Sequence, residues 1–181
     1  MPTRITVFCA LTIALLIGGF VFPAQSQPRA EMSSTSRVPV TTAEAKRTGP
    51  GTYLLTWNRT SAETPVSVYV SGRPSATAAQ MHLLSTNVES TRYEATVPDS
   101  ISRPYFLIQP DRKSQGLRTS TRVLPLKGGR NFRDLGGYTA SKGQRVKWGT
   151  IFRSGVLSSL TNADYDYLSD LGIKVVCDFR S

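Results

Sequence analysis

The stretch TIFRSGVLSSLTNADYDYLSDLGIKVVCDFRS, residues 150–181, predicts in order a short strand, a helix and a second strand. Residues 150–155 have β-type composition and end at a glycine. Thr161 is followed three residues later by Asp164, which predicts the start of a helix with an acidic first turn. Apolar side chains then recur at helical spacing up to a helix-ending glycine: Ala163, Tyr167, Leu168, Leu171 and Gly172. The β-branched run IKVVCDF, residues 173–179, predicts the second strand.

A strand, a helix and a strand in this order form a βαβ unit, whose two strands are expected to be parallel. Parallel sheets are usually covered on both faces and contain several strands. Two strands and one helix cannot bury a core of their own. We therefore expect residues 127–181 to be the first part of a truncated α/β domain, and we expect proteolysis to leave a core that ends near residues 126–130.

The preceding residues, 38–126, have a different pattern. Short runs of β-type residues recur at even spacing between turn signals, which is typical of an all-β sandwich. The predicted strands are 53–57, 66–70, 81–84, 93–97, 105–108 and 121–124. The pattern resembles fibronectin type III or immunoglobulin-like modules. In such a small sandwich Trp57 is expected in the core.

The first 26 residues have the features of a secretory signal peptide. Arg4 precedes a long apolar run, and Ala24 and Ser26 supply small residues before a cleavage point. The alternative is an uncleaved membrane anchor, because the run is long for a signal. Residues 27–37 are polar and serine-rich, which indicates a linker. The sequence therefore predicts an exported protein, periplasmic or secreted.

The composition limits the classes of partner. The chain has 22 Lys and Arg against 12 Asp and Glu, a net charge of +10. Such a balance favours anionic partners, but the basic residues are scattered, so we expect no nucleic-acid binding. With one histidine and only two cysteines, Cys9 and Cys177, the sequence predicts no metal site and no cofactor. Cys177, inside an apolar strand, is expected to be a core residue.

Both predicted strands of the βαβ unit end in the same tripeptide, Phe-Arg-Ser. In open α/β sheets ligands bind beyond the carboxyl ends of the strands. Arg153 and Arg180 would then reach one rim, with Asp178 beside them, and two guanidinium groups suit a phosphate. The alternative is that these arginines pair with carboxylates of the fold.

Several motifs of this region occur in a characteristic order: NFRDLGG at 131–137, FRSG at 152–155 with LS and LT after it, LGI at 171–173, and DFRS at 178–181. Together they resemble the opening of the bacterial tyrosine/serine protein phosphatases of the secreted PtpB type. The resemblance covers less than a third of the chain. Some exported members similarly carry a β-sandwich-like region before the catalytic domain.

The resemblance implies a cysteine-phosphatase fold, in which a thiolate attacks phosphorus and a phosphocysteine intermediate forms. Its signature loop, H-C-x-x-G-K-D-R-T-G, is absent from this sequence, so no residue here is the nucleophile. The resemblance implies that Asn131, Arg133 and Asp134 support that loop, and that Asp178 and Arg180 line its mouth.

These observations predict that the intact gene product is an exported phosphatase. Its substrates would be phosphotyrosine, phosphoserine/threonine or phosphoinositide, and this chain alone would be inactive. The alternative is a non-catalytic exported binding module that acts through its β-sandwich.

Overall fold

The computed structural model describes residues 40–59, 64–110 and 114–178. The predicted signal peptide and linker lie outside the described residues, as do Phe179, Arg180 and Ser181. Among the described residues, no helix is both long enough and apolar enough to cross a membrane.

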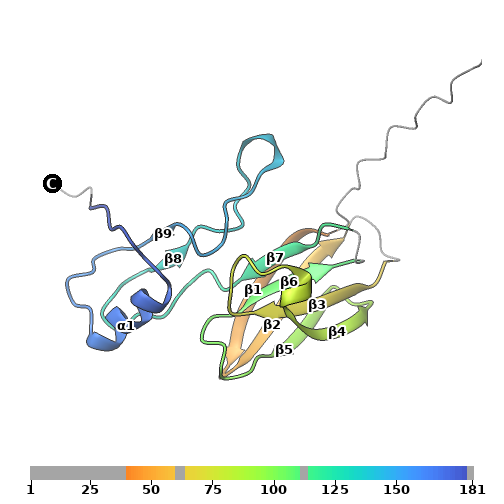
Figure 1. Cartoon of the computed structure of the whole chain (residues 1–181), viewed down its shortest axis with the longest axis horizontal. Helices are drawn as coiled ribbons and strands as arrows, with labels where there is room; N and C mark the ends of the chain where they lie inside the picture. Colours follow the sequence, from red (N-terminus) through yellow and green to blue (C-terminus); the bar gives the residue numbers. More distant parts are fainter. Residues whose placement is uncertain (1–39, 60–63, 111–113, 179–181) are drawn as a thin grey trace, which may run out of the picture. The chain divides into compact units, whose positions relative to one another are not determined.

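Most of the described chain consists of strands in antiparallel sheets, with few helices (Figure 1). One sheet has the strand order β1-β2-β5 and the second has the order β4-β3-β6-β7; together they are called the two-sheet region below. The strands are β1 (Val40–Gly49), β2 (Thr52–Arg59), β3 (Val66–Ser71), β4 (His82–Val88), β5 (Arg92–Thr96), β6 (Tyr105–Gln109) and β7 (Leu117–Ser120).

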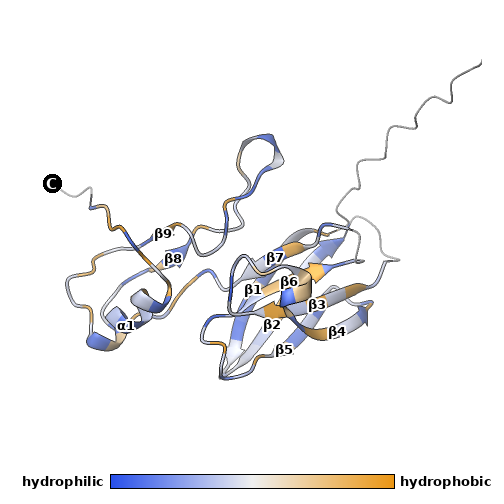
Figure 2. Ribbon diagram, viewed as in Figure 1, coloured by the Kyte–Doolittle hydropathy of each residue, from blue (hydrophilic) through white to orange (hydrophobic). Residues whose placement is uncertain are grey.

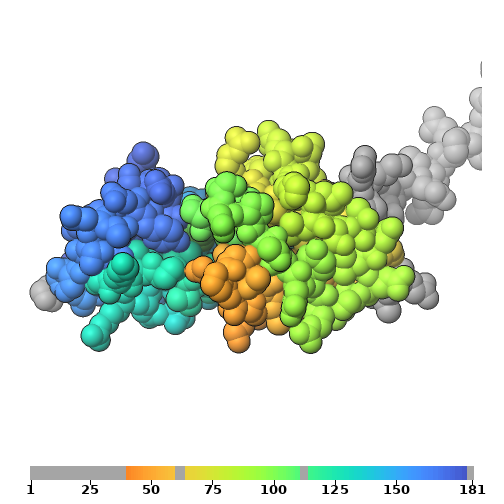
Figure 3. Space-filling view, turned by 90° about the horizontal axis from the view of Figure 1, so that it is seen from below, coloured from red at the N-terminus to blue at the C-terminus, as the bar shows by residue number. Residues whose placement is uncertain are grey.

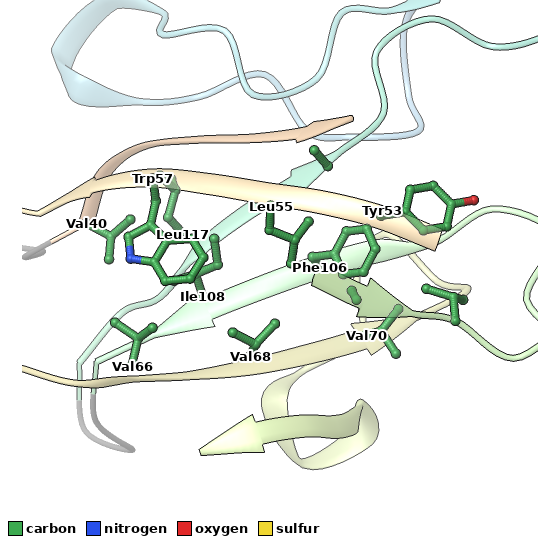
Figure 4. Packing of buried hydrophobic residues seen from close by; sticks show 13 residues of the cluster. Val40, Tyr53, Leu55, Trp57, Val66, Val68, Val70, Phe106, Ile108 and Leu117 are labelled. Atoms are coloured by element: carbon green, nitrogen blue, oxygen red, sulfur yellow. The ribbon is translucent and has the colours of Figure 1, made fainter. Parts of the chain in front are cut away.

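The two sheets contribute side chains to one hydrophobic core. Along β3 buried and part-exposed residues alternate, as the period of a strand requires, so Val66, Val68 and Val70 all point to one side. Figure 4 shows them opposite Leu55 and Trp57 of β2. Trp57 is only 3% exposed, which confirms its expected place in the core.

The strands differ from the prediction at both ends of this region. The ten-residue strand β1 was missed because its sequence, VTTAEAKRTG, is largely polar and its only fully buried residues are Val40 and Ala45. The last strand of the sheet is β7, not the predicted run 121–124. Residues 122–124 instead pair with the chain that follows: Leu124 N–H donates to the Phe132 carbonyl at 3.0 Å.

The tail, residues 122–178, contains two short strands and one α-helix. Strands β8 (Arg133–Asp134) and β9 (Phe152–Arg153) pair with each other in antiparallel register. The predicted parallel βαβ unit is not formed in the described residues, because its first strand pairs in antiparallel register with the NFRDLGG motif and residues 173–178 form no second strand. The tail supplies the teal and blue surface in Figure 3.

The predicted helix is confirmed as α1 (Asn162–Asp170). Thr161 and Asp164 form a reciprocal capping box, and Gly172, with a φ of 70°, follows the helix end. The Asp164 carboxylate also accepts hydrogen bonds from the Lys127 and Gly128 amides, at 2.7 and 2.8 Å. Hydrogen bonds to the charged form, first from Thr161 and then from these amides, lower the pKa of Asp164 to about 2.

The predicted second strand of the βαβ unit is not formed in the described residues 173–178. Figure 2 shows apolar residues in this stretch, yet Val175 and Val176 are 75% and 72% exposed. Cys177 is also exposed, so its assignment to the core is wrong in this structure. A strand needs a neighbour for its backbone N–H and C=O groups, and none of the described residues pairs with this stretch.

Candidate functional site

The NFRDLGG motif and the FRSG motif meet in the two-stranded ribbon β8–β9. Asp134 is opposite Phe152, and Arg133 is opposite Arg153. Because successive side chains of a strand point to opposite faces, the first pair lies on one face of the ribbon and the second pair on the other. Asp134 is fully buried, whereas both arginines are exposed. The ribbon thus has an inner face that packs and an outer face that is basic.

The inner face is organised around the Asp134 carboxylate. It forms an ion pair with Arg103, which precedes β6 in the two-sheet region. The same carboxylate accepts hydrogen bonds from the Gly136 amide at 2.7 Å and the Gly149 amide at 2.8 Å. A buried charge is tolerated only when it is paired and hydrogen-bonded, and all three donors serve this one group. Asp134 therefore connects the two-sheet region to two separate loops of the tail.

Arg103 is held between aromatic rings. Its guanidinium carbon lies 4.8 Å from the ring centroid of Tyr105 and 5.4 Å from that of Phe152. The Phe152 ring is itself stacked on Phe132, with centroids 5.3 Å apart. These contacts add cation–π attraction to the ion pair. Burial, the largest cause, raises the pKa of Tyr105 to about 12.

A second arginine supports the backbone of the motif. Arg122 donates from Nη1 to the carbonyl oxygens of Asp134 at 2.9 Å and Gly136 at 3.0 Å. Its guanidinium also lies 4.0 Å from the Tyr138 ring centroid and 5.2 Å from that of Trp148. This side chain therefore fixes the turn that follows β8.

Trp148 explains the glycine pair of the motif. Its Nε1 donates to the Arg118 carbonyl at 3.1 Å, so the ring is anchored on β7. A Cβ added at Gly136 would lie 2.5 Å from the Trp148 Cα, and one added at Gly137 would lie 2.7 Å from the indole ring. Gly137 also has a φ of 77°, which favours glycine. The motif carries two glycines because the backbone approaches the indole closely.

Asn131 begins the motif in a left-handed backbone conformation, with a φ of 59°, which asparagine tolerates better than most residues. The carbonyl of the preceding Arg130 accepts hydrogen bonds from the Gly155 amide at 2.8 Å and the Ser154 hydroxyl at 3.3 Å. The start of the first motif is thereby joined to the end of the second.

The structure brings some of the predicted site residues together. Asn131, Arg133, Asp134 and Arg153 all belong to the ribbon or its immediate start. Asp178 is exposed in the stretch after α1, and Arg180 lies outside the described residues. The proposed mouth formed by Arg153, Asp178 and Arg180 thus stays a prediction.

Within the described ranges, no group of three or more His, Cys, Asp or Glu side chains could hold a metal ion. The ribbon offers two exposed guanidinium groups and a buried carboxylate already occupied by three donors. Such an arrangement can bind and orient an anion, but it contains no group placed to attack phosphorus.

Sequence reasoning missed Arg103, Arg122 and Trp148, which hold the motif in place. Arg103 has no local signal, since it is a single arginine in a turn before β6. The glycine pair was a usable signal for Trp148, because adjacent glycines often mark a close approach of backbone to a bulky group. The long-range partners themselves could not be read from spacing along the chain.

Comparison with known proteins places this region in context. Residues 124–181 match the tyrosine phosphatase family. A segment of 51 residues is 45% identical to a Cupriavidus necator protein that carries the provisional name tyrosine-protein phosphatase. That alignment covers 28% of this chain and 19% of the relative. The chain thus aligns with about a fifth of the relative's length, and the family match includes β8, β9 and α1.

Proposed function

We propose that this chain is the N-terminal part of a tyrosine phosphatase that hydrolyses phosphomonoesters. The observation that carries the proposal is the family match over residues 124–181, which contains the ribbon built from NFRDLGG and FRSG. The basic outer face of that ribbon suits a phosphorylated substrate. The relative with 45% identity over 51 residues supports the same reaction class.

In this proposal the described tail is framework, and the reacting group lies elsewhere. A cysteine thiolate would attack phosphorus, the ester P–O bond would break, and the leaving oxygen would take a proton from a general acid. Water would then release phosphate and regenerate the thiolate. No H-C-x5-R loop occurs in residues 1–181, so we propose that it follows this segment in the gene product.

The supporting roles are proposed residue by residue. Asp134, whose carboxylate accepts hydrogen bonds from the Gly136 and Gly149 amides, would brace the signature loop together with Asn131 and Arg133. Arg153, Asp178 and Arg180 would line the mouth of the site. The ordered motifs further suggest the secreted PtpB type, with phosphotyrosine, phosphoserine/threonine or phosphoinositide as substrate.

The preceding region is proposed to be a fibronectin type III-like sandwich. Its two antiparallel sheets, with orders β1-β2-β5 and β4-β3-β6-β7, share one core, which supports this arrangement. The apolar run and small residues before position 26 support export to the periplasm or medium, with an uncleaved anchor as the alternative. In the competing hypothesis, the same region is a binding module without catalysis.

The test is to express the full gene product and residues 27–181 side by side. Release of phosphate from a phosphotyrosine peptide is measured for both. We expect turnover by the full product and none by residues 27–181. An absence of an H-C-x5-R loop in the codons after Ser181, or an inactive full product, would refute the phosphatase and favour the binding module.

A further inference from the structure

The outer face of the ribbon holds two arginines directly opposite each other. Arg133 and Arg153 are Cα partners in the antiparallel pair β8–β9, and both side chains are exposed. Side chains directly opposite in an antiparallel pair lie on the same face, and like charges there destabilise the pair. The arrangement places two positive charges on one solvent-exposed face, and an anion bound between the two guanidinium groups would neutralise their repulsion.

Three other arginines in and around the tail are committed to the fold, whereas Arg130 is exposed like the pair. Arg103 pairs with Asp134, and Arg122 donates to two carbonyls of the motif. Arg145 donates to the carbonyls of Gly137 and Thr41, at 3.0 and 2.9 Å. These three side chains have a structural use that is visible in their hydrogen bonds.

Arg133 and Arg153 have no such use. Among the residues that the structure describes, no carboxylate forms an ion pair with either guanidinium, and neither donates a side-chain hydrogen bond. All of their donors are therefore available to a ligand, in the planar fork that matches a phosphate.

The ribbon also fixes the backbone positions of the two arginines relative to each other. Directly beneath them, on the inner face, are the Asp134 carboxylate with its three donors and the stacked rings of Phe132 and Phe152. A site whose backbone is fixed in advance loses less entropy when a ligand binds.

We propose that Arg133 and Arg153 form a two-arginine clamp for the phosphate group of a phosphomonoester, a role that for Arg133 replaces the loop-supporting one given above. This assignment rests on the proposed phosphatase function and places a phosphate-recognition site on the ribbon, formed by one residue from each motif. Each guanidinium donates to phosphate oxygens, and the dianion neutralises the repulsion between them. Inorganic phosphate and the phosphoryl group of a peptide share this chemistry.

The experiment is an NMR titration of residues 27–181, so it needs no catalytic activity. Separate samples receive inorganic phosphate, a phosphotyrosine peptide, the same peptide unphosphorylated, or sodium chloride at matched ionic strength. We expect saturable shifts confined to the amides of β8 and β9 and to the Nε–H groups of Arg133 and Arg153, with phosphate and phosphopeptide only. Tighter binding of the phosphopeptide would identify a substrate site, and equal binding a free-phosphate site.

Variants test the assignment to the two side chains. Arg133→Ala with Arg153→Ala should weaken phosphate binding by roughly tenfold or more, because charge-assisted hydrogen bonds are lost. Arg153→Lys should also weaken it, because an ammonium cannot make the paired bonds. Arg92→Ala, an exposed arginine on β5, is the matched control and should leave binding unchanged.

Three results would overturn the clamp: no saturable shift on the ribbon in the unaltered protein, equal shifts with chloride, or equal weakening by Arg92→Ala. Unchanged affinity in Arg153→Lys would refute bidentate binding. Near-ultraviolet circular dichroism of each variant checks that the ribbon is folded. Because the titration measures binding and not activity, a negative titration refutes the clamp without refuting the proposed function. An inactive full product would refute the proposed function without changing the binding result.

Discussion

Asp134→Ala is the substitution that most sharply tests how the motif is held. Removing the carboxylate leaves Arg103 buried without its partner and takes the acceptor from the Gly136 and Gly149 amides. Breaking a buried ion pair by deleting one partner typically costs about 3–5 kcal/mol. Small domains have a total stability of about 5–15 kcal/mol, so the loss should be plain.

The assay combines urea unfolding with amide exchange on residues 27–181. We expect the free energy of unfolding to fall by about 3–5 kcal/mol. If the tail opens separately from the two sheets, the amides of Gly136 and Gly149 should lose their protection from exchange first. Glu94→Ala removes an exposed carboxylate on β5 and serves as the control. The double variant Arg103→Met with Asp134→Leu should recover part of the loss, because no buried charge remains. A change below about 1 kcal/mol with both glycine amides still protected would refute the reasoning.

Three further predictions concern the tail. The pKa of Asp164 is about 2, below its ordinary value of 3.8, so its contribution to stability is present above about pH 4 and is lost as the pH falls toward 2. Amide exchange in α1 should therefore become faster only below about pH 4, and faster exchange already at pH 5 would contradict the prediction. Gly128→Ala should destabilise the protein by about 1–3 kcal/mol, since the added Cβ would lie 1.6 Å from the Ser159 carbonyl oxygen. Gly72→Ala is the control and should be tolerated, because its Cβ would lie 3.7 Å from the nearest atom. Equal melting temperatures of the two variants would count against this packing. Limited proteolysis should leave a core extending to about Arg153, and a core ending near residues 126–130 would show that the ribbon is not held.

The sequence predicts what depends on local pattern. Trp57 is expected in the core because so small a sandwich needs a large buried aromatic, and it is buried. The helix was located from Thr161 and Asp164, three residues apart, and the capping box confirms it. Both inferences rest on local signals, namely the residue type and alternation around Trp57 and the two capping residues that bond to each other.

What the sequence does not predict depends on distant partners. The run 173–178 has strand composition, but it remains unpaired in the described structure, and Val175 and Val176 are exposed. Arg103 and Asp134 form the central ion pair of the candidate site although 31 positions separate them. Neither fact can be obtained from periodicity, which reports only which face of an element is apolar.

The same distinction explains why the expected proteolytic boundary has moved. Sequence composition changes near Lys127, which suggested that the later residues would be left without a core. In the structure Phe132, Asp134 and Trp148 are buried, and Asp134 and Trp148 are bonded to the two-sheet region through Arg103 and the Arg118 carbonyl. The boundary in composition is therefore not a boundary in packing, and the candidate site is built where the two regions meet.

The proposed function places the catalytic cysteine of a phosphatase outside residues 1–181. Its most direct test is acid quenching of the full gene product with a ³²P-labelled phosphotyrosine peptide, followed by mapping of the labelled residue. We predict a phosphocysteine in a loop after Ser181, and no label on Cys177. Label on Cys177, or turnover with no covalent phosphoenzyme at any quench time, would contradict the account.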